Sequence, residues 1–68
     1  MSPTPKQMGR RLQALRMKQK MSRQELAAKA GVTREYVRLV EAGRRDLTVG
    51  TLQKLAKALG VSAADLMK

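Results

Sequence analysis

The sequence predicts an all-α fold, a compact bundle of five short helices in a single domain. Apolar residues recur at helical spacing through most of the chain. Residues that favour helix N-termini, and glycines that favour helix ends, separate the periodic segments from one another. No segment shows the alternation of polar and apolar residues that is typical of a strand. A chain of 68 residues provides material for one domain and not for two.

The composition excludes several kinds of functional site. The chain has no His and no Cys, so metal sites built from imidazole or thiolate, and nucleophile–histidine pairs, are ruled out. We therefore expect no catalytic residue, no metal ion and no cofactor, and a protein that is not an enzyme. No apolar run approaches the ~20 residues of a membrane span, and the N-terminus lacks the apolar core of a signal peptide. We expect a cytoplasmic protein that contacts no membrane.

Positive charge gathers in the N-terminal two thirds of the chain. The formal net charge is +10, from 15 Lys and Arg against 5 Asp and Glu. Residues 1–45 hold 12 of the basic and 3 of the acidic side chains, a net charge of +9, which leaves +1 for residues 46–68. Such a concentration is typical of a protein that binds a polyanion. Composition alone leaves ribosomal, RNA-binding and membrane-surface proteins open as alternatives.

The N-terminal segment predicts a disordered arm over residues 1–5 and a helix over residues 6–19. The arm is polar and contains two prolines, and contact with nucleic acid is an alternative role for it. In the helix, Met8, Leu12 and Leu15 lie on one side. This basic amphipathic stretch, taken alone, also fits a membrane-surface helix. Its apolar stripe is narrow, and the rest of the chain needs it as a core partner, so we expect residues 6–68 to form one domain.

Residues 22–43 predict two short helices that are joined by a tight turn. Ser22, followed three residues later by Glu25, forms the pattern of a capping box at the start of the first helix. Gly31 can adopt the positive φ that ends this helix. Thr33 is a natural N-cap for the second helix, which ends at Gly43.

The second of these helices, over residues 33–42, has two different sides on a helical wheel. One side is a narrow apolar stripe centred on Val37 and Val40. Glu35 and Leu39 lie on the other side, roughly 140–200° away from Val37, with Arg34 and Arg38 on one flank. A solvated amphipathic helix is the ordinary interpretation. The preceding helix, the glycine turn and the basic chain favour instead a helix-turn-helix whose second helix enters the DNA major groove.

The C-terminal segment predicts a loop and two further helices. Thr48 is a suitable N-cap for a fourth helix, and Ser62 with Asp65 repeats the capping-box pattern for a short last helix. The fourth helix has a stripe at i, i+3, i+4 and i+7 spacing, made of Leu52, Leu55, Ala56 and Leu59.

The motifs in this order resemble the phage-repressor and Cro-type helix-turn-helix family, with a lambda-repressor-like DNA-binding domain, over residues 8–66. The matching stretches are M-G-R-R-L-x-x-L-R, S-R-Q-E-L-A-x-x-x-G-V-T, V-x-x-V-E-x-G and T-L-x-K-L-A-K-A-L-G-V-S. Residues 34–36 also resemble the Arg-x-Tyr of restriction–modification controller proteins. The resemblance implies a bacterial or phage transcriptional regulator, a repressor or controller, that binds double-stranded DNA at the nucleoid.

The resemblance also implies a role for individual side chains. It implies base reading by Arg34, Glu35, Arg38 and Leu39. An arginine fork meets O6 and N7 of guanine, a glutamate accepts from N4 of cytosine, and a leucine contacts a thymine methyl. It implies phosphate or sugar contacts by Arg23, Gln24, Tyr36, Arg44 and Arg45. For Tyr36 the alternative is packing in the core, and for the two loop arginines it is a solvated loop.

Arg16 and Glu41 match the arginine and glutamate that form an ion pair in the family. Each lies beside an apolar stripe, where an unpaired charge is costly, so the resemblance implies a structural role for the pair. It implies further a weak two-fold homodimer on a palindromic operator, with half-sites ~34 Å apart. The predicted dimer contact consists of Val61, Ala64, Leu66 and Met67. The alternative function is that of an antitoxin or adaptor whose main partner is a protein.

Overall fold

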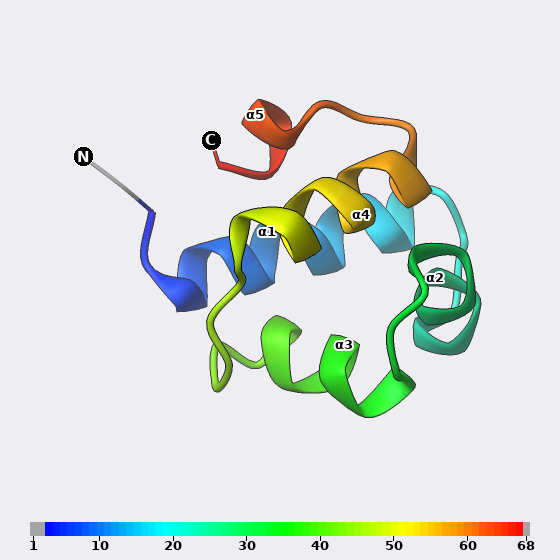
Figure 1. Cartoon of the computed structure of the whole chain (residues 1–68), viewed down its shortest axis with the longest axis horizontal. Helices are drawn as coiled ribbons and strands as arrows, with labels where there is room; N and C mark the ends of the chain where they lie inside the picture. Colours follow the sequence, from blue (N-terminus) through cyan, green and yellow to red (C-terminus); the bar gives the residue numbers. More distant parts are fainter. Residues whose placement is uncertain (1–2, 68) are drawn as a thin grey trace.

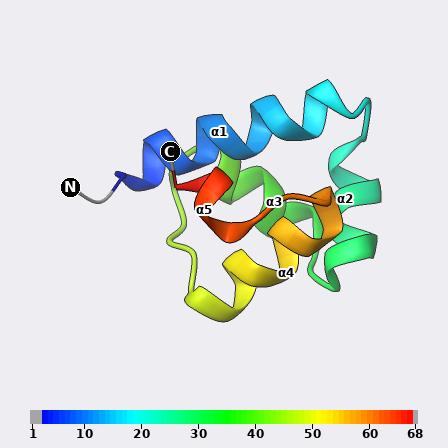
Figure 2. The same ribbon diagram turned by 90° about the horizontal axis from the view of Figure 1, so that it is seen from above.

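The computed structural model describes residues 3–67, and this part of the chain contains five α-helices and no strand. The helices are α1 (Pro5–Lys18), α2 (Arg23–Ala30), α3 (Arg34–Glu41), α4 (Val49–Leu59) and α5 (Ala63–Leu66). In Figure 1, α4 passes in front of α1, and α3 lies below both of them. Figure 2, seen from above, shows α5 over the layer that α1 and α4 form, and α5 contacts both helices. The predicted all-α bundle of five helices is confirmed.

Helix α1 begins one residue before the predicted start at Lys6. The Thr4 hydroxyl accepts a hydrogen bond from the Gln7 backbone N–H (3.1 Å), and the Gln7 side chain accepts from the Thr4 N–H (2.9 Å). Pro5 occupies the first helical position, where a missing N–H costs nothing. Residues 4 and 5 therefore belong to the folded domain and not to the predicted arm. The first two residues of that arm lie outside the described range.

The helix-turn-helix segment has the predicted caps. The Ser22 hydroxyl accepts from the Glu25 backbone N–H (3.0 Å), and the Glu25 carboxylate accepts from the Ser22 N–H (2.8 Å). Gly31 ends α2 with a φ of 72°, a conformation that side chains with a Cβ rarely adopt. The Thr33 hydroxyl accepts from a backbone N–H in the first turn of α3. These local bonds determine where both helices begin and where the first one ends.

The core is aliphatic and includes one residue that we predicted at the surface. The largest fully buried side chains are Leu12, Leu26, Leu55, Leu66, Val37 and Val40. Leu66 is 1% exposed, so its predicted role in a dimer contact is wrong. Helix α5 packs against both α4 and α1, and the Arg11 Nε donates to the backbone oxygen of Asp65 (2.9 Å); this packing buries Leu66.

Helices α1 and α3 cross in close contact at Gly9. A Cβ at this position would overlap the backbone oxygen of Val40 and would lie 2.7 Å from that of Glu41. A glycine is therefore required for the two helices to approach this closely. The crossing places α3 with Val37 inward and its opposite side toward solvent.

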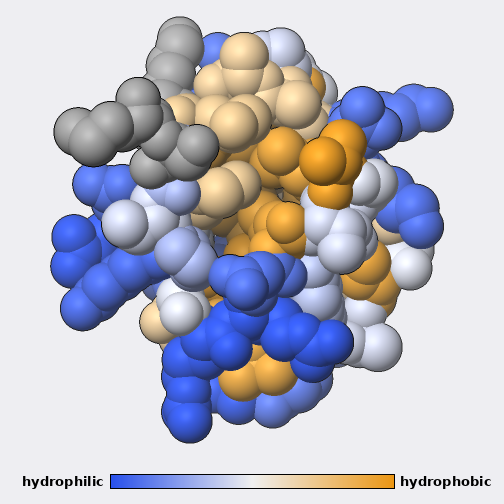
Figure 3. All heavy atoms as spheres, turned by 60° about the vertical axis from the view of Figure 1, so that its left-hand side comes forward, coloured by the Kyte–Doolittle hydropathy of each residue, from blue (hydrophilic) through white to orange (hydrophobic). Residues whose placement is uncertain are grey.

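The surface divides into an apolar and a hydrophilic region in the view of Figure 3. The apolar region is in the upper half, on the side of α5, and the strongly hydrophilic region is in the lower half, on the side of α3 and the loop that precedes α4. Large exposed apolar side chains within residues 3–67 are Met17 (61%), Val49 (71%) and Met67 (45%). None of the helices in this range is long and apolar enough to cross a lipid bilayer.

Candidate nucleic-acid interface

The outward side of α3 presents three of the four predicted base-reading side chains to solvent. Arg34, Glu35 and Arg38 are exposed. Val37 and Val40, beneath them, are 0% and 1% exposed. Because side chains on a helix repeat with a period of about 3.6 residues, burial of the two valines directs the three charged side chains away from the core. The exposed ridge on α3 thus exists as a geometric feature.

Leu39, the fourth predicted base-reading residue, is only partly exposed. It lies in the last turn of α3, where its backbone oxygen accepts from the N–H of Arg44 (2.9 Å). The chain therefore turns into the following loop close to this residue. Its side chain presents less apolar surface to a thymine methyl than the sequence predicted.

Glu35 and Arg38 form an exposed ion pair on the ridge. Arg38 donates from Nε to Oε1 of Glu35 (2.7 Å) and from Nη2 to Oε2 (2.6 Å). This hydrogen bonding by Arg38 lowers the pKa of the Glu35 carboxyl, and Glu35 in turn raises the pKa of Arg38. Both side chains are therefore charged at neutral pH. The sequence predicted two independent base-reading residues, and the structure brings them together as one bidentate pair.

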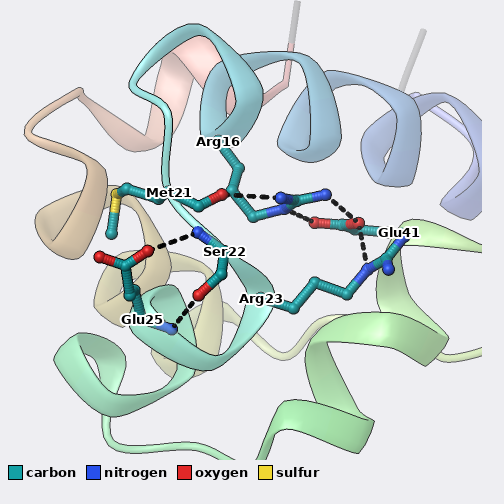
Figure 4. Close-up of polar contacts among 6 residues, drawn as sticks. All are labelled: Arg16, Met21, Ser22, Arg23, Glu25 and Glu41. Atoms are coloured by element: carbon teal, nitrogen blue, oxygen red, sulfur yellow. Dashed lines mark hydrogen bonds and ion pairs between the residues drawn. The ribbon is translucent and has the colours of Figure 1, made fainter.

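Glu41 joins three helices beneath the ridge through a cluster of charged side chains (Figure 4). Arg16 donates to its carboxylate from Nε (2.6 Å) and from Nη2 (3.1 Å). The remaining Nη1 of Arg16 donates to the backbone oxygen of Met21 (2.8 Å). The Arg16 and Glu41 side chains are 10% and 2% exposed, so this is the buried ion pair that the resemblance implies.

Arg23 is a second partner of Glu41 that the sequence did not indicate. Its Nε donates to Oε1 of Glu41 (2.9 Å), and its side chain is 39% exposed. Arg23 lines two surface hollows, one next to Arg38 and one next to Arg34 and Gln24. The side chain therefore connects the buried cluster to the exposed ridge. Pairing between α2 and α3 depends on their packing, and no local pattern in the sequence could have revealed it.

The loop after α3 is fastened to Tyr36. The tyrosine ring is half-buried against the core, and its hydroxyl donates to the backbone oxygen of Asp46 (3.3 Å). The Arg45 guanidinium lies over the ring, 5.6 Å from its centroid, in a cation–π arrangement. Tyr36 thus resembles the core-packing alternative more than a free phosphate contact. Its ring positions Arg45, and the neighbouring Arg44 is exposed.

The sequence over residues 12–66 matches the family described as helix-turn-helix. The chain belongs to the helix-turn-helix family. An uncharacterized HTH-type transcriptional regulator of Sinorhizobium fredii is 39% identical over 62 residues, which cover 91% of this chain and 80% of that protein. The crystal structure of the restriction-modification controller protein C.AhdI from Aeromonas hydrophila has a TM-score of 0.91 at 35% identity. The match covers 93% of this chain and 96% of the controller.

The same helix-turn-helix fold also occurs as part of a larger protein. Hydroxypropylphosphonic acid epoxidase from S. wedmorenis matches with a TM-score of 0.86 at 30% identity, over 96% of this chain but only 35% of the epoxidase. The regulator and the controller match over most of their own length. The predicted family resemblance is confirmed, and this helix-turn-helix protein is a DNA-binding transcriptional regulator.

Proposed function

We propose that this regulator binds a palindromic operator as a two-fold dimer, with α3 of each protomer in the major groove, and thereby represses or controls transcription. The exposed ridge of α3 is the observation that carries the proposal. Arg34 and Arg38 project from this ridge, and a guanidinium fork meets O6 and N7 of guanine in the major groove. The rigid valine stripe underneath holds both arginines on the outward side.

Polar and basic side chains that flank α3 support this docking. A helix in the major groove lies between two phosphate backbones, which fix its position. Arg23 and Gln24 lie on the first turn of α2, in a hollow that Arg34 at the start of α3 also lines, and the free N–H groups of this turn also favour a phosphate. Beyond the C-terminal end, Arg44 and Arg45 are exposed in the loop. The proposal assigns these four side chains to phosphate contacts.

The proposed dimer contact lies around α5, on the apolar region of Figure 3. Ala64 and Met67 are exposed there, and Val61 is partly exposed. With Leu66 buried in its own protomer, the remaining apolar surface is small, and a small interface gives a weak dimer. Simultaneous binding of two half-sites then stabilises the dimer on DNA.

The proposal includes no catalytic role. The side chains gathered around α3 are arginines and the glutamates paired with them, and such groups suit hydrogen bonding to bases and phosphates. Residues 3–67 contain no group of three or more His, Cys, Asp or Glu side chains that could hold a metal ion. A regulator of this kind acts at the nucleoid, in the cytoplasm.

Selection of bound DNA from a random pool at physiological salt tests the proposal. We expect enrichment of a palindrome with half-sites about one helical turn, ~34 Å, apart. Log K should fall with log salt at a slope of about −0.9 for each phosphate neutralised. Arg34→Ala should weaken binding to the enriched sequence. Lys57→Ala removes the same charge from α4 and should leave base preference intact. A pool without an enriched sequence, or binding that salt does not weaken, contradicts the proposal.

A further inference from the structure

The Glu35–Arg38 pair lies where it contributes little to folding. The Glu35 and Arg38 side chains are 63% and 48% exposed, and ion pairs that exposed contribute little stability. The geometry is nevertheless specific, because both carboxylate oxygens accept from the same guanidinium, at 2.7 and 2.6 Å. A bidentate pair of this kind fixes the plane of the arginine head group. The pair therefore acts on the orientation of Arg38 more than on the fold.

The donors that Glu35 leaves unused form a second fork on Arg38. Glu35 accepts from Nε and Nη2, along one edge of the guanidinium. Nη1, and the other hydrogen of Nη2, point away from the aliphatic stem of the side chain. These terminal N–H groups have the spacing that the O6 and N7 atoms of guanine accept. Arg38 can therefore bind a guanine without releasing Glu35.

The charge of Glu35 acts against contacts that carry no sequence information. Arg23, Arg34 and Arg38 line adjoining hollows along α2 and α3. The other glutamate of α3, Glu41, is 2% exposed and is bound to two arginines. Glu35 is thus the solvent-exposed carboxylate of this helix. Its negative charge repels phosphate, which opposes non-specific binding of Arg38 to the DNA backbone.

We infer that Glu35 is a positioning residue for Arg38, which orients the terminal fork of Arg38 toward a guanine and disfavours its contact with phosphate. This role replaces the predicted one, in which Glu35 reads a cytosine itself. It rests on the proposed function, because it needs α3 in the major groove. A pre-oriented side chain loses less conformational freedom on binding, and the carboxylate adds selectivity through repulsion.

The test compares the operator obtained by selection with a scrambled duplex of the same composition. Glu35→Gln should weaken operator binding about threefold and should strengthen scrambled-duplex binding about threefold, so that the preference falls about tenfold. Glu25→Gln is the matched control, because it removes the same charge and a capping box accepts Gln in place of Glu. It should retain the wild-type preference. An equal loss of preference in both variants would overturn the inference, since net charge alone would then explain it.

Arg38→Ala distinguishes a positioning residue from an independent base-reading residue. In the Arg38→Ala background, Glu35→Gln should no longer weaken operator binding. In the single variant, the loss of discrimination should fall on the same base pair that Arg38→Ala affects. A loss at a different base pair, or an effect that persists without Arg38, shows that Glu35 contacts a base on its own and overturns the inference.

The wild-type measurement separates this inference from the proposed function. If the wild-type protein binds both duplexes equally, the proposed operator binding fails, and the role of Glu35 fails with it. If the wild type prefers the operator and Glu35→Gln retains that preference, only the role of Glu35 is overturned. Thermal melting of the Glu35→Gln and Arg38→Ala variants, which should match the wild type because both side chains are exposed, excludes misfolding as the cause.

Discussion

The two glutamates of α3 both accept hydrogen bonds from arginines, but one of them is buried and the other is exposed. Glu41 is 2% exposed and accepts from Arg16 and Arg23, which come from two other helices. Glu35 is 63% exposed and accepts from Arg38 on its own helix. The first pair connects separate parts of the fold, and the second connects neighbouring positions on one surface. Burial therefore decides whether an ion pair of this protein maintains the position of α3 or shapes what α3 presents.

The physical reason lies in the cost of desolvation. A buried charge that loses its partner cannot recover hydration, so the protein loses much of its free energy of unfolding. An exposed charge that loses its partner is hydrated by water, so the free energy of unfolding falls only slightly. Substitutions in the two pairs should therefore affect different quantities, stability for Glu41 and base preference for Glu35.

The largest effect is expected for Glu41→Ala, which breaks the buried cluster. It leaves Arg16 buried without a carboxylate, and we expect a loss of about 3–5 kcal/mol in the free energy of unfolding. Urea unfolding at low temperature measures this loss while the variant remains partly folded. The double variant Arg16→Met with Glu41→Leu removes both buried charges and should lose less than the single one. A loss below about 1 kcal/mol for Glu41→Ala would contradict the structural role of the cluster.

Gly9→Ala should produce the next largest effect, without removing any charge. The new Cβ would press on the backbone of α3 at Val40 and Glu41, and overpacking of this kind costs about 1–3 kcal/mol. It should also weaken operator binding, because α3 shifts. Gly50→Ala is the control, since a Cβ there meets nothing within 4 Å and should stabilise α4 slightly. Equal melting temperatures for the two variants would show that α1 and α3 have room to separate.

Arg23→Ala tests the role of the side chain that lies between the buried Arg16–Glu41 cluster and the exposed ridge of α3. Glu41 retains Arg16, and Arg23 is 39% exposed, so unfolding should become easier by less than about 1 kcal/mol. Binding to all DNA sequences should weaken, with the salt slope reduced in magnitude by about one. Lys29→Ala, which removes a charge from the other end of α2, should leave the slope closer to that of the wild type. An unchanged slope for Arg23→Ala would mean that Arg23 serves the cluster alone.

The same contrast explains what could be predicted from the sequence. Patterns within four residues were sufficient to predict the N-caps of α2, α3 and α5, because capping depends on local hydrogen bonds. The spacing of Glu35 and Arg38 was also compatible with an ion pair, a signal that the base-reading interpretation left unused. The Thr4–Gln7 cap was missed because two prolines suggested disorder.

Contacts between distant segments could not be predicted in the same way. Arg23 reaches Glu41 only because α2 and α3 pack together. Leu66 is in the core because α5 packs against α4 and α1. Each of these features depends on tertiary packing, which no stretch of sequence contains by itself.

The smallest effect concerns the pKa of Glu35. The hydrogen bond from Arg38 lowers this pKa below the ordinary value of 4.5. Because the folded pKa is lowered, the contribution of the pair is complete above the ordinary pKa and is lost as pH falls through the lowered one. Glu25, whose pKa is lowered by hydrogen bonding to Ser22, loses its contribution with the same sign and is an internal standard.

Carbon NMR of the carboxyl groups during acid titration measures both midpoints in one sample. In Arg38→Ala the midpoint of Glu35 should rise toward its ordinary value, because the donor that stabilised the carboxylate is gone. The midpoint of Glu25 should stay where it is, since its carboxylate accepts from Ser22 and not from Arg38. If the Glu35 midpoint does not move, the bidentate pair is absent in solution. Arg38 would then lack its positioning partner, and the ridge would carry two independent side chains.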